Sequence, residues 1–79
     1  MKIDIYTKPQ CSWCDDTKNL LKKHDVDYTE HVIGFTVTRD EVLNKFPGAT
    51  VLPLVLVDDV WIGGRLEIAK ILNERNNNV

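Results

Sequence analysis

The stretch Thr7-Lys8-Pro9-Gln10-Cys11-Ser12-Trp13-Cys14 joins an expected strand to an expected helix through a pair of cysteines. Before it, Ile3 and Ile5 alternate with polar residues at the period of a strand, and the prolyl segment then breaks the extended chain. After it, apolar positions recur at helical spacing from Ser12 to His24, where basic residues suit the negative end of a helix dipole. We therefore expect a strand, a loop, a cysteine and a helix in that order.

Two further elements are expected in the middle of the chain. Alternation from Val26 to Ile33 predicts a second strand that ends at Gly34. Thr38-Arg39-Asp40-Glu41 has the pattern of a capping box, in which Thr38 and Glu41 each satisfy a free amide, and it predicts a second helix that stops at Pro47-Gly48.

The last third of the chain predicts a hairpin and a helix. Leu54-Val55-Leu56-Val57 is typical of a strand that is covered on both faces, and Asp58-Asp59 can turn it into Val60-Trp61-Ile62. A third helix is expected around Leu66 to Leu72, and it fades into a polar, flexible tail at residues 76–79. The element order βαβαββα predicts an α/β fold, with a mixed four-stranded sheet and helices on both faces.

Length and composition favour one small domain over residues 1–79, since single domains commonly run to about 100–200 residues. A net charge of -2 gives no sign of a nucleic-acid-binding surface. The 2 cysteines are too few for the disulfide framework of a small secreted domain, and no apolar run suits a signal peptide or a membrane span. We therefore expect a monomer in the reducing cytoplasm, without nucleic-acid or membrane partners.

The cysteine pair is the strongest chemical signal in the sequence. Cys11 is expected just before the first helix and Cys14 one turn inside it, close enough for a disulfide. Helix amides and the nearby Lys8 favour negative charge on Cys11, so Cys11 is the expected attacking thiolate and Cys14 the resolving thiol. This pattern predicts thiol–disulfide exchange.

Two rival interpretations of the cysteines are weaker. A zinc site would need Cys11, Cys14, His24 and His31, but nine residues separate Cys14 from His24 and six separate the histidines. A zinc finger needs about 12 residues and then about 3–5 at these places. The other rival is a pair of inert, buried cysteines. The histidines are given no catalytic role, and Trp61 is assigned to packing alone.

Beyond these patterns, the sequence resembles a glutaredoxin, a small member of the thioredoxin-fold family, over nearly the whole chain. The resemblance rests on Tyr6-Thr7-Lys8 followed by Cys11-x-x-Cys14, on Thr50-Val51-Leu52-Pro53, and on Ile62-Gly63-Gly64. It implies a glutathione-dependent oxidoreductase that reduces protein disulfides and glutathione mixed disulfides, with ribonucleotide reductase as one candidate substrate and no metal.

The resemblance also implies where glutathione lies. Pro53 would be cis and face the dithiol, Lys8 would take the glycine carboxylate with help from Arg39, and Trp13 would flank the sulfur. The backbone of Leu52 would pair with the cysteinyl part, and the γ-glutamyl end would lie after the glycine pair. The implied glutathione-binding residues are Lys8, Trp13, Arg39, Leu52, Pro53, Gly64, Arg65, Leu66 and Glu67, of which Glu67 would meet the ligand ammonium.

Two alternative functions remain open at this point. Leu52-Pro53 together with Trp61-x-Gly63-x-Arg65 is also similar to redoxins that thioredoxin reductase recharges. Alternatively, Cys11 thiolates from two chains and two glutathione molecules would hold a [2Fe-2S] cluster. Ser12, at a position where most dithiol glutaredoxins have proline, makes the first turn less rigid and so favours this cluster-carrying alternative.

Overall fold

The computed structural model describes residues 1–49 and 52–77, and its elements follow the expected order. They are β1 (Ile3–Thr7), α1 (Ser12–Lys23), β2 (Tyr28–Val32), α2 (Arg39–Lys45), β3 (Leu54–Val57), β4 (Val60–Gly63) and α3 (Arg65–Asn77). The predicted order βαβαββα is therefore confirmed. Within the two described ranges, no helix is both long and apolar enough to cross a membrane.

The strands form a mixed sheet in the order β2-β1-β3-β4. β1 and β2 run parallel because α1 returns the chain to the end of the sheet at which β1 began. β3 is antiparallel to both β1 and β4, and a tight turn joins β3 to β4. The predicted mixed sheet is thus confirmed, with β1 and β3 at its centre.

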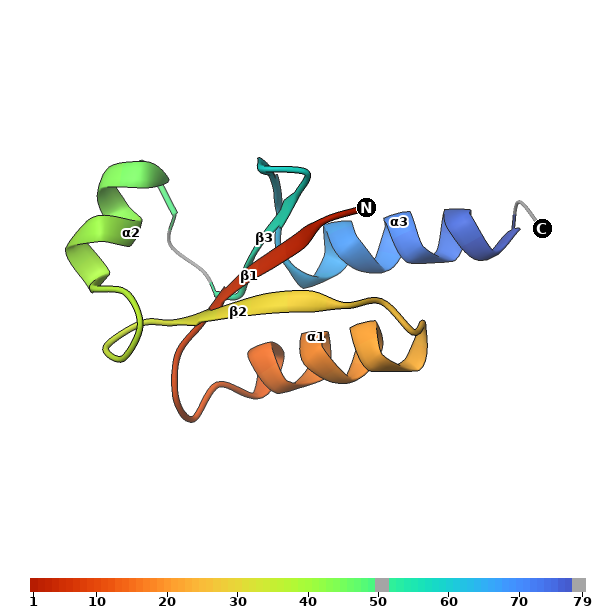
Figure 1. Ribbon diagram of the computed structural model, residues 1–79, viewed down its shortest axis with the longest axis horizontal. Helices are drawn as coiled ribbons and strands as arrows, with labels where there is room; N and C mark the ends of the chain where they lie inside the picture. Colours follow the sequence, from red (N-terminus) through yellow and green to blue (C-terminus); the bar gives the residue numbers. More distant parts are fainter. Residues whose placement is uncertain (50–51, 78–79) are drawn as a thin grey trace.

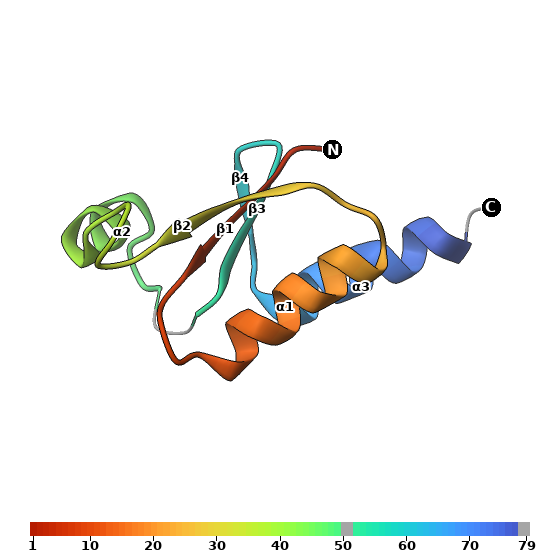
Figure 2. The ribbon, with the colours of Figure 1, turned by 60° about the horizontal axis from the view of Figure 1, so that its bottom comes forward.

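Helices cover both faces of this sheet. α1 and α3 lie side by side on one face, whereas α2 lies well apart from them (Figures 1 and 2). The core cluster under α1 and α3 consists of Ile3, Ile5, Leu21, Val26, Val55, Ile68 and Leu72. The cluster on the α2 side consists of Tyr6, Val42, Phe46, Leu54 and Leu56. Alternate residues of β1 and β3 enter different clusters, as the period of a strand requires.

The second strand is shorter than the sequence predicts. Val26 belongs to the turn after α1, because its amide donates to the Leu21 carbonyl at 3.0 Å and Asp25 before it has a φ of 54°. Ile33, at the other end, forms only an isolated bridge with Val37. Val26 is still 8% exposed and contributes to the core, so its apolar character reflects burial without strand pairing.

The ends of α2 and α3 also differ in detail from expectation. The Thr38 hydroxyl caps α2 by accepting from the Glu41 amide at 3.1 Å, as predicted. The Glu41 carboxylate accepts a hydrogen bond from the Thr38 hydroxyl at 3.2 Å. A capping box predicts that the donor to this carboxylate is the Thr38 backbone amide instead. α3 continues to Asn77, two residues into the stretch expected to be a tail, and residues 78–79 of that tail lie outside the described part of the chain.

Candidate active site

Cys11 caps the N-terminus of α1. Its backbone is extended (φ -117°, ψ 106°), and its Sγ accepts a hydrogen bond from the Cys14 amide at 3.3 Å. Gln10 before it has a φ of 57°, so the chain turns sharply between β1 and the helix. The sulfur therefore lies where helix amides and the helix dipole favour negative charge.

Cys14 lies deeper, in the first turn of α1. It is 1% exposed, compared with 9% for Cys11, and both cysteines are free thiols. Burial, helped by a hydrogen bond with the Cys11 side chain and opposed by the Lys8 backbone, raises the pKa of the Cys14 thiol to about 12. Cys14 is thus held in the neutral form beside a more accessible sulfur.

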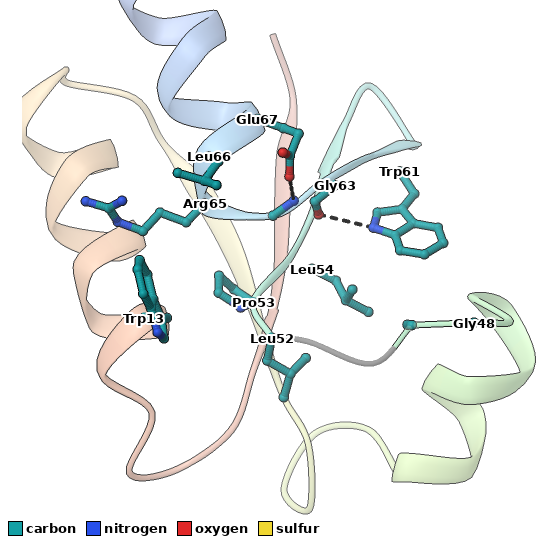
Figure 3. Close-up of a pocket in the computed structure, with 12 residues that line it drawn as sticks. Trp13, Gly48, Leu52, Pro53, Leu54, Trp61, Gly63, Arg65, Leu66 and Glu67 are labelled. Carbon is teal, nitrogen blue, oxygen red and sulfur yellow. Dashed lines mark hydrogen bonds between the residues drawn. The ribbon is translucent and has the colours of Figure 1, made fainter.

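A pocket of about 350 Å³ has in its wall Trp13, the residue that precedes Cys14 in the chain (Figure 3). Neither cysteine is among the described residues that line it. It brings together seven residues that the resemblance assigns to glutathione: Trp13, Leu52, Pro53, Gly64, Arg65, Leu66 and Glu67. Lys8 and Arg39 are exposed and are not part of the pocket's described lining. The structure therefore brings together the residues expected at the apolar and γ-glutamyl parts of the ligand. It does not bring Lys8 and Arg39, the cations expected at the glycine carboxylate, into the described lining.

The loop before β3 forms the floor of the pocket. The Leu52–Pro53 peptide bond is cis, as the resemblance implies, and Figure 3 shows Pro53 between Trp13 and Gly63. A Cβ on Gly64 would lie 2.8 Å from the Pro53 carbonyl oxygen, so glycine is needed at this position for the two loops to meet. Thr50 and Val51, which belong to the same expected segment, lie outside the described residues.

Arg65 links the start of α3 to α1. Its guanidinium carbon lies 5.2 Å from the centre of the Trp13 ring, and its Nε is 3.9 Å from Asp16 Oδ2. The stacked cation holds Trp13 against the start of α3, although Trp13 remains 55% exposed. One wall of the pocket is therefore a Trp–Arg pair contributed by two helices.

Glu67 has a partner that the sequence analysis does not anticipate. Its Oε1 accepts a hydrogen bond from the Gly64 amide at 2.7 Å. The expectation was that Glu67 would be available to a ligand ammonium. In the structure, one of its carboxylate oxygens caps α3.

Trp61 is the main pocket residue that the sequence analysis missed. We assigned it to packing alone, but it is 38% exposed and lines the pocket. Its indole N–H donates to the Gly63 carbonyl at 3.1 Å, and its ring meets the Phe46 ring edge-on with centroids 5.5 Å apart. The sequence feature that indicates this role is the position of Trp61 on a strand, two residues before Gly63-Gly64. That position brings its ring to the end of the hairpin.

The histidines lie apart from this chemistry. His31 Nε2 is 3.0 Å from Asp4 Oδ1, and its ring stacks on Tyr6 with centroids 4.6 Å apart. His24 ends α1 as its C-cap. Across residues 1–49 and 52–77, no group of three or more His, Cys, Asp or Glu side chains is placed to hold a metal ion.

Comparison with known proteins agrees with this geometry. Residues 3–62 match the family model described as Glutaredoxin. Glutaredoxin 3 of Escherichia coli K12 is 34% identical over 62 residues, which cover 78% of this chain and 75% of the relative.

Solved structures show the same fold. Glutaredoxin 1 from Francisella tularensis, complexed with cacodylate, superposes with a TM-score of 0.79 at 22% identity and 96% coverage of both chains. Oxidized Escherichia coli glutaredoxin has a TM-score of 0.76 at 25% identity, covering 98% of this chain and 99% of that one. The predicted thioredoxin-like α/β fold is therefore confirmed.

Proposed function

Since the chain belongs to the glutaredoxin family of redox proteins, we propose that it reduces protein disulfides and glutathione mixed disulfides through Cys11 and Cys14, with glutathione as reductant. One observation carries the proposal: the Cys11 sulfur lies at the α1 N-terminus, accepting from the Cys14 amide, with a protonated thiol beside it. The less buried sulfur, at a helix start, suits nucleophilic attack, and the more deeply buried neighbouring thiol suits the second step.

The reaction then proceeds by two exchanges. The Cys11 thiolate attacks one sulfur of the substrate disulfide, the S–S bond breaks, and the other half leaves as a thiolate that takes up a proton. Cys14 loses its proton and attacks the Cys11 sulfur, which releases the second half and leaves a Cys11–Cys14 disulfide. Two glutathione thiols reduce this disulfide and become glutathione disulfide.

The pocket suits a ligand that lies across the loop before β3. Leu52 would pair its backbone with an extended peptide, as an added strand does, while Pro53 and Trp13 would flank the reacting sulfur. Lys8 and Arg39, which lie outside the pocket lining, would act on the ligand only through longer-range attraction.

Single-cysteine variants test the roles of the two thiols. We expect Cys11→Ser to lose all thiol transfer, because the other of the 2 cysteines, Cys14, is 1% exposed and its pKa is raised. Cys14→Ser should keep activity on a glutathionylated peptide and lose the reduction of protein disulfides that need both thiols. Rates of peptide thiol release for the two variants would measure this. Equal loss in both would show that the roles are wrongly assigned.

A second candidate reductant is thioredoxin reductase. One observation favours it, namely that Lys8 and Arg39, the cations expected at the glycine carboxylate of glutathione, are not among the described lining residues of the pocket. Turnover with glutathione plus glutathione reductase, compared with turnover with thioredoxin reductase on the same disulfide, distinguishes the two. Faster turnover with thioredoxin reductase would replace glutathione in the proposal.

We also propose the cytoplasm as the setting, because a dithiol recharged by glutathione needs a reducing thiol pool. Ribonucleotide reductase is a candidate protein substrate, since its catalytic cycle leaves a disulfide that a dithiol can reduce. Deoxyribonucleotide formation driven by this protein, with Cys14→Ser as control, tests that partner.

A further inference from the structure

The N-terminus of α3 already holds a carboxylate from within the chain. Glu67 is the third residue of the helix, and from this position its Oε1 takes the Gly64 amide at 2.7 Å. Its side chain also lies over Gly63, where a built Cβ would collide with the carboxylate. The space and the amide at this end of the pocket are therefore both occupied by Glu67.

Among the described residues, no cationic side chain pairs with Glu67, although amides at the start of α3 face its carboxylate. In the described part of the chain, Glu67 makes this hydrogen bond and no ion pair. Arg65, which also lines the pocket, is turned toward Asp16 and the Trp13 ring. Figure 3 shows the two side chains leaving α3 in different directions, Arg65 toward Trp13 and Glu67 toward Gly63. The Gly63 end of the pocket is consequently negative.

The remaining walls near this end are apolar. Leu52, Leu54 and Leu66 line the same pocket, and Leu66 is 68% exposed. An anion entering here would meet a like charge, and because Glu67 and Leu66 are exposed, water and salt keep that repulsion modest. A cation or an apolar group would meet no such opposition.

We propose that Glu67 sets the substrate preference of this pocket by standing in the place of a ligand carboxylate. Disulfides flanked by an ammonium or an apolar group then react faster than disulfides flanked by a carboxylate. The inference rests on the proposed thiol–disulfide exchange and names its substrate class. The γ-glutamyl end of glutathione carries both an ammonium and a carboxylate. A Glu67 that opposes the carboxylate slows the reaction with glutathione, whereas a Glu67 that attracts the ammonium would speed it.

Three probes on one fluorescent peptide thiol isolate this effect. The peptide is linked by a disulfide to cysteamine, to 3-mercaptopropionate or to glutathione, so that the first two differ in the sign of the terminal charge. Reduced protein attacks the probe sulfur through Cys11, the peptide thiolate leaves, and Cys14 displaces the probe as the dithiol is oxidised. Peptide release in a single turnover gives a second-order rate constant without any added reductant.

The variant is Glu67→Gln, whose amide oxygen can still accept from Gly64 and keep the cap. Glu74→Gln removes the same charge from an exposed position further along α3 and serves as the matched control. We expect Glu67→Gln to raise the rate constants for mercaptopropionate and glutathione probes about two- to five-fold and to lower that for cysteamine. The changes should shrink at high salt, and Glu74→Gln should leave the ratios as in the wild type.

Two results would overturn the inference. One is a slower reaction of Glu67→Gln with the glutathione probe and an unchanged rate with mercaptopropionate, which would assign Glu67 to the ligand ammonium. The other is the same set of ratios in Glu67→Gln as in the wild type. A wild-type protein that is reduced but reacts with no probe would refute the proposed function itself, and the inference with it.

Discussion

At the scale of single residues, the two thiols differ in the state in which the fold holds them. Burial raises the pKa of Cys14 to about 12, so its thiolate is scarce at neutral pH, whereas Cys11 lies at the positive end of α1. We expect iodoacetamide at pH 7.5 to modify reduced protein at Cys11 alone, because the thiolate is the reactive form. Peptide mass spectrometry after timed quenching would measure the two sites, with urea-unfolded protein as the control in which both react. Comparable rates at the two sites in folded protein would contradict this assignment.

At the scale of elements, Glu30 in β2 links three of them. Its Oε2 accepts from the Thr7 hydroxyl of β1 at 2.7 Å and lies 3.1 Å from Lys18 Nζ of α1. The pKa of Glu30 lies below its ordinary value of 4.5, chiefly because Thr7 donates a hydrogen bond to the carboxylate. Partial burial opposes this lowering, and Lys18 adds to it. Because the folded chain binds this proton less readily than the unfolded chain, the stabilisation is complete above pH 4.5 and is lost as the pH falls through the lowered value.

Glu30→Gln should therefore lower the free energy of unfolding by about 1 kcal/mol at pH 7, and the difference from wild type should shrink in acid. Urea titrations at pH 7 and at pH 3 measure the loss in free energy of unfolding and its decrease in acid. The control variant Glu74→Gln, at an exposed position, should show no loss at either pH. A difference that persists unchanged at pH 3 would show that lost packing, and not the charge, is responsible.

At the scale of the whole molecule, stability depends on two thin cores on opposite faces of the sheet. A chain of 79 residues is expected to have a free energy of unfolding of about 4–12 kcal/mol. Leu72→Ala, which truncates a side chain of α3 with 0% exposure in the core, should lower it by about 2–5 kcal/mol. Leu43 of α2 is 41% exposed, so Leu43→Ala should change the free energy of unfolding by less than about 0.5 kcal/mol. Urea denaturation followed by circular dichroism compares them, and equal losses would show that the α1–α3 core is not the main source of stability.

Much of this architecture follows from local patterns in the sequence. The alternation of Ile3 and Ile5, the cap at Thr38 and the Asp58-Asp59 turn each specify an element through neighbouring residues alone. Both aspartates have positive φ values, 50° and 68°, as a tight hairpin turn requires. The ends of β2 were less predictable, because Val26 is buried by tertiary packing without joining the strand.

The pocket was harder to predict because its contacts join distant segments. Trp13, Pro53 and Gly64, from the three motifs of the resemblance, line one cavity, and their roles toward a ligand stay a prediction. The bond between Glu67 and Gly64 depends on the residue at which α3 begins, which apolar periodicity leaves uncertain by a residue or more. The sequence is equally consistent with Trp61 packing in the core and with Trp61 lining a pocket. A strand at the end of a hairpin has neighbours of both kinds.

The position of Trp61 gives the protein a built-in optical probe. The chain has 2 tryptophans, Trp13 and Trp61, and both line the same pocket. Indole emission shifts to shorter wavelength when the ring loses contact with water, and a nearby sulfur can quench it. When the excitation wavelength is long enough to leave Tyr6 and Tyr28 unexcited, the fluorescence of the unlabelled protein therefore comes from the two indoles of this pocket. Occupation of the pocket and the redox state of the adjacent cysteines can be followed by light in real time, with no dye and no coupled enzyme.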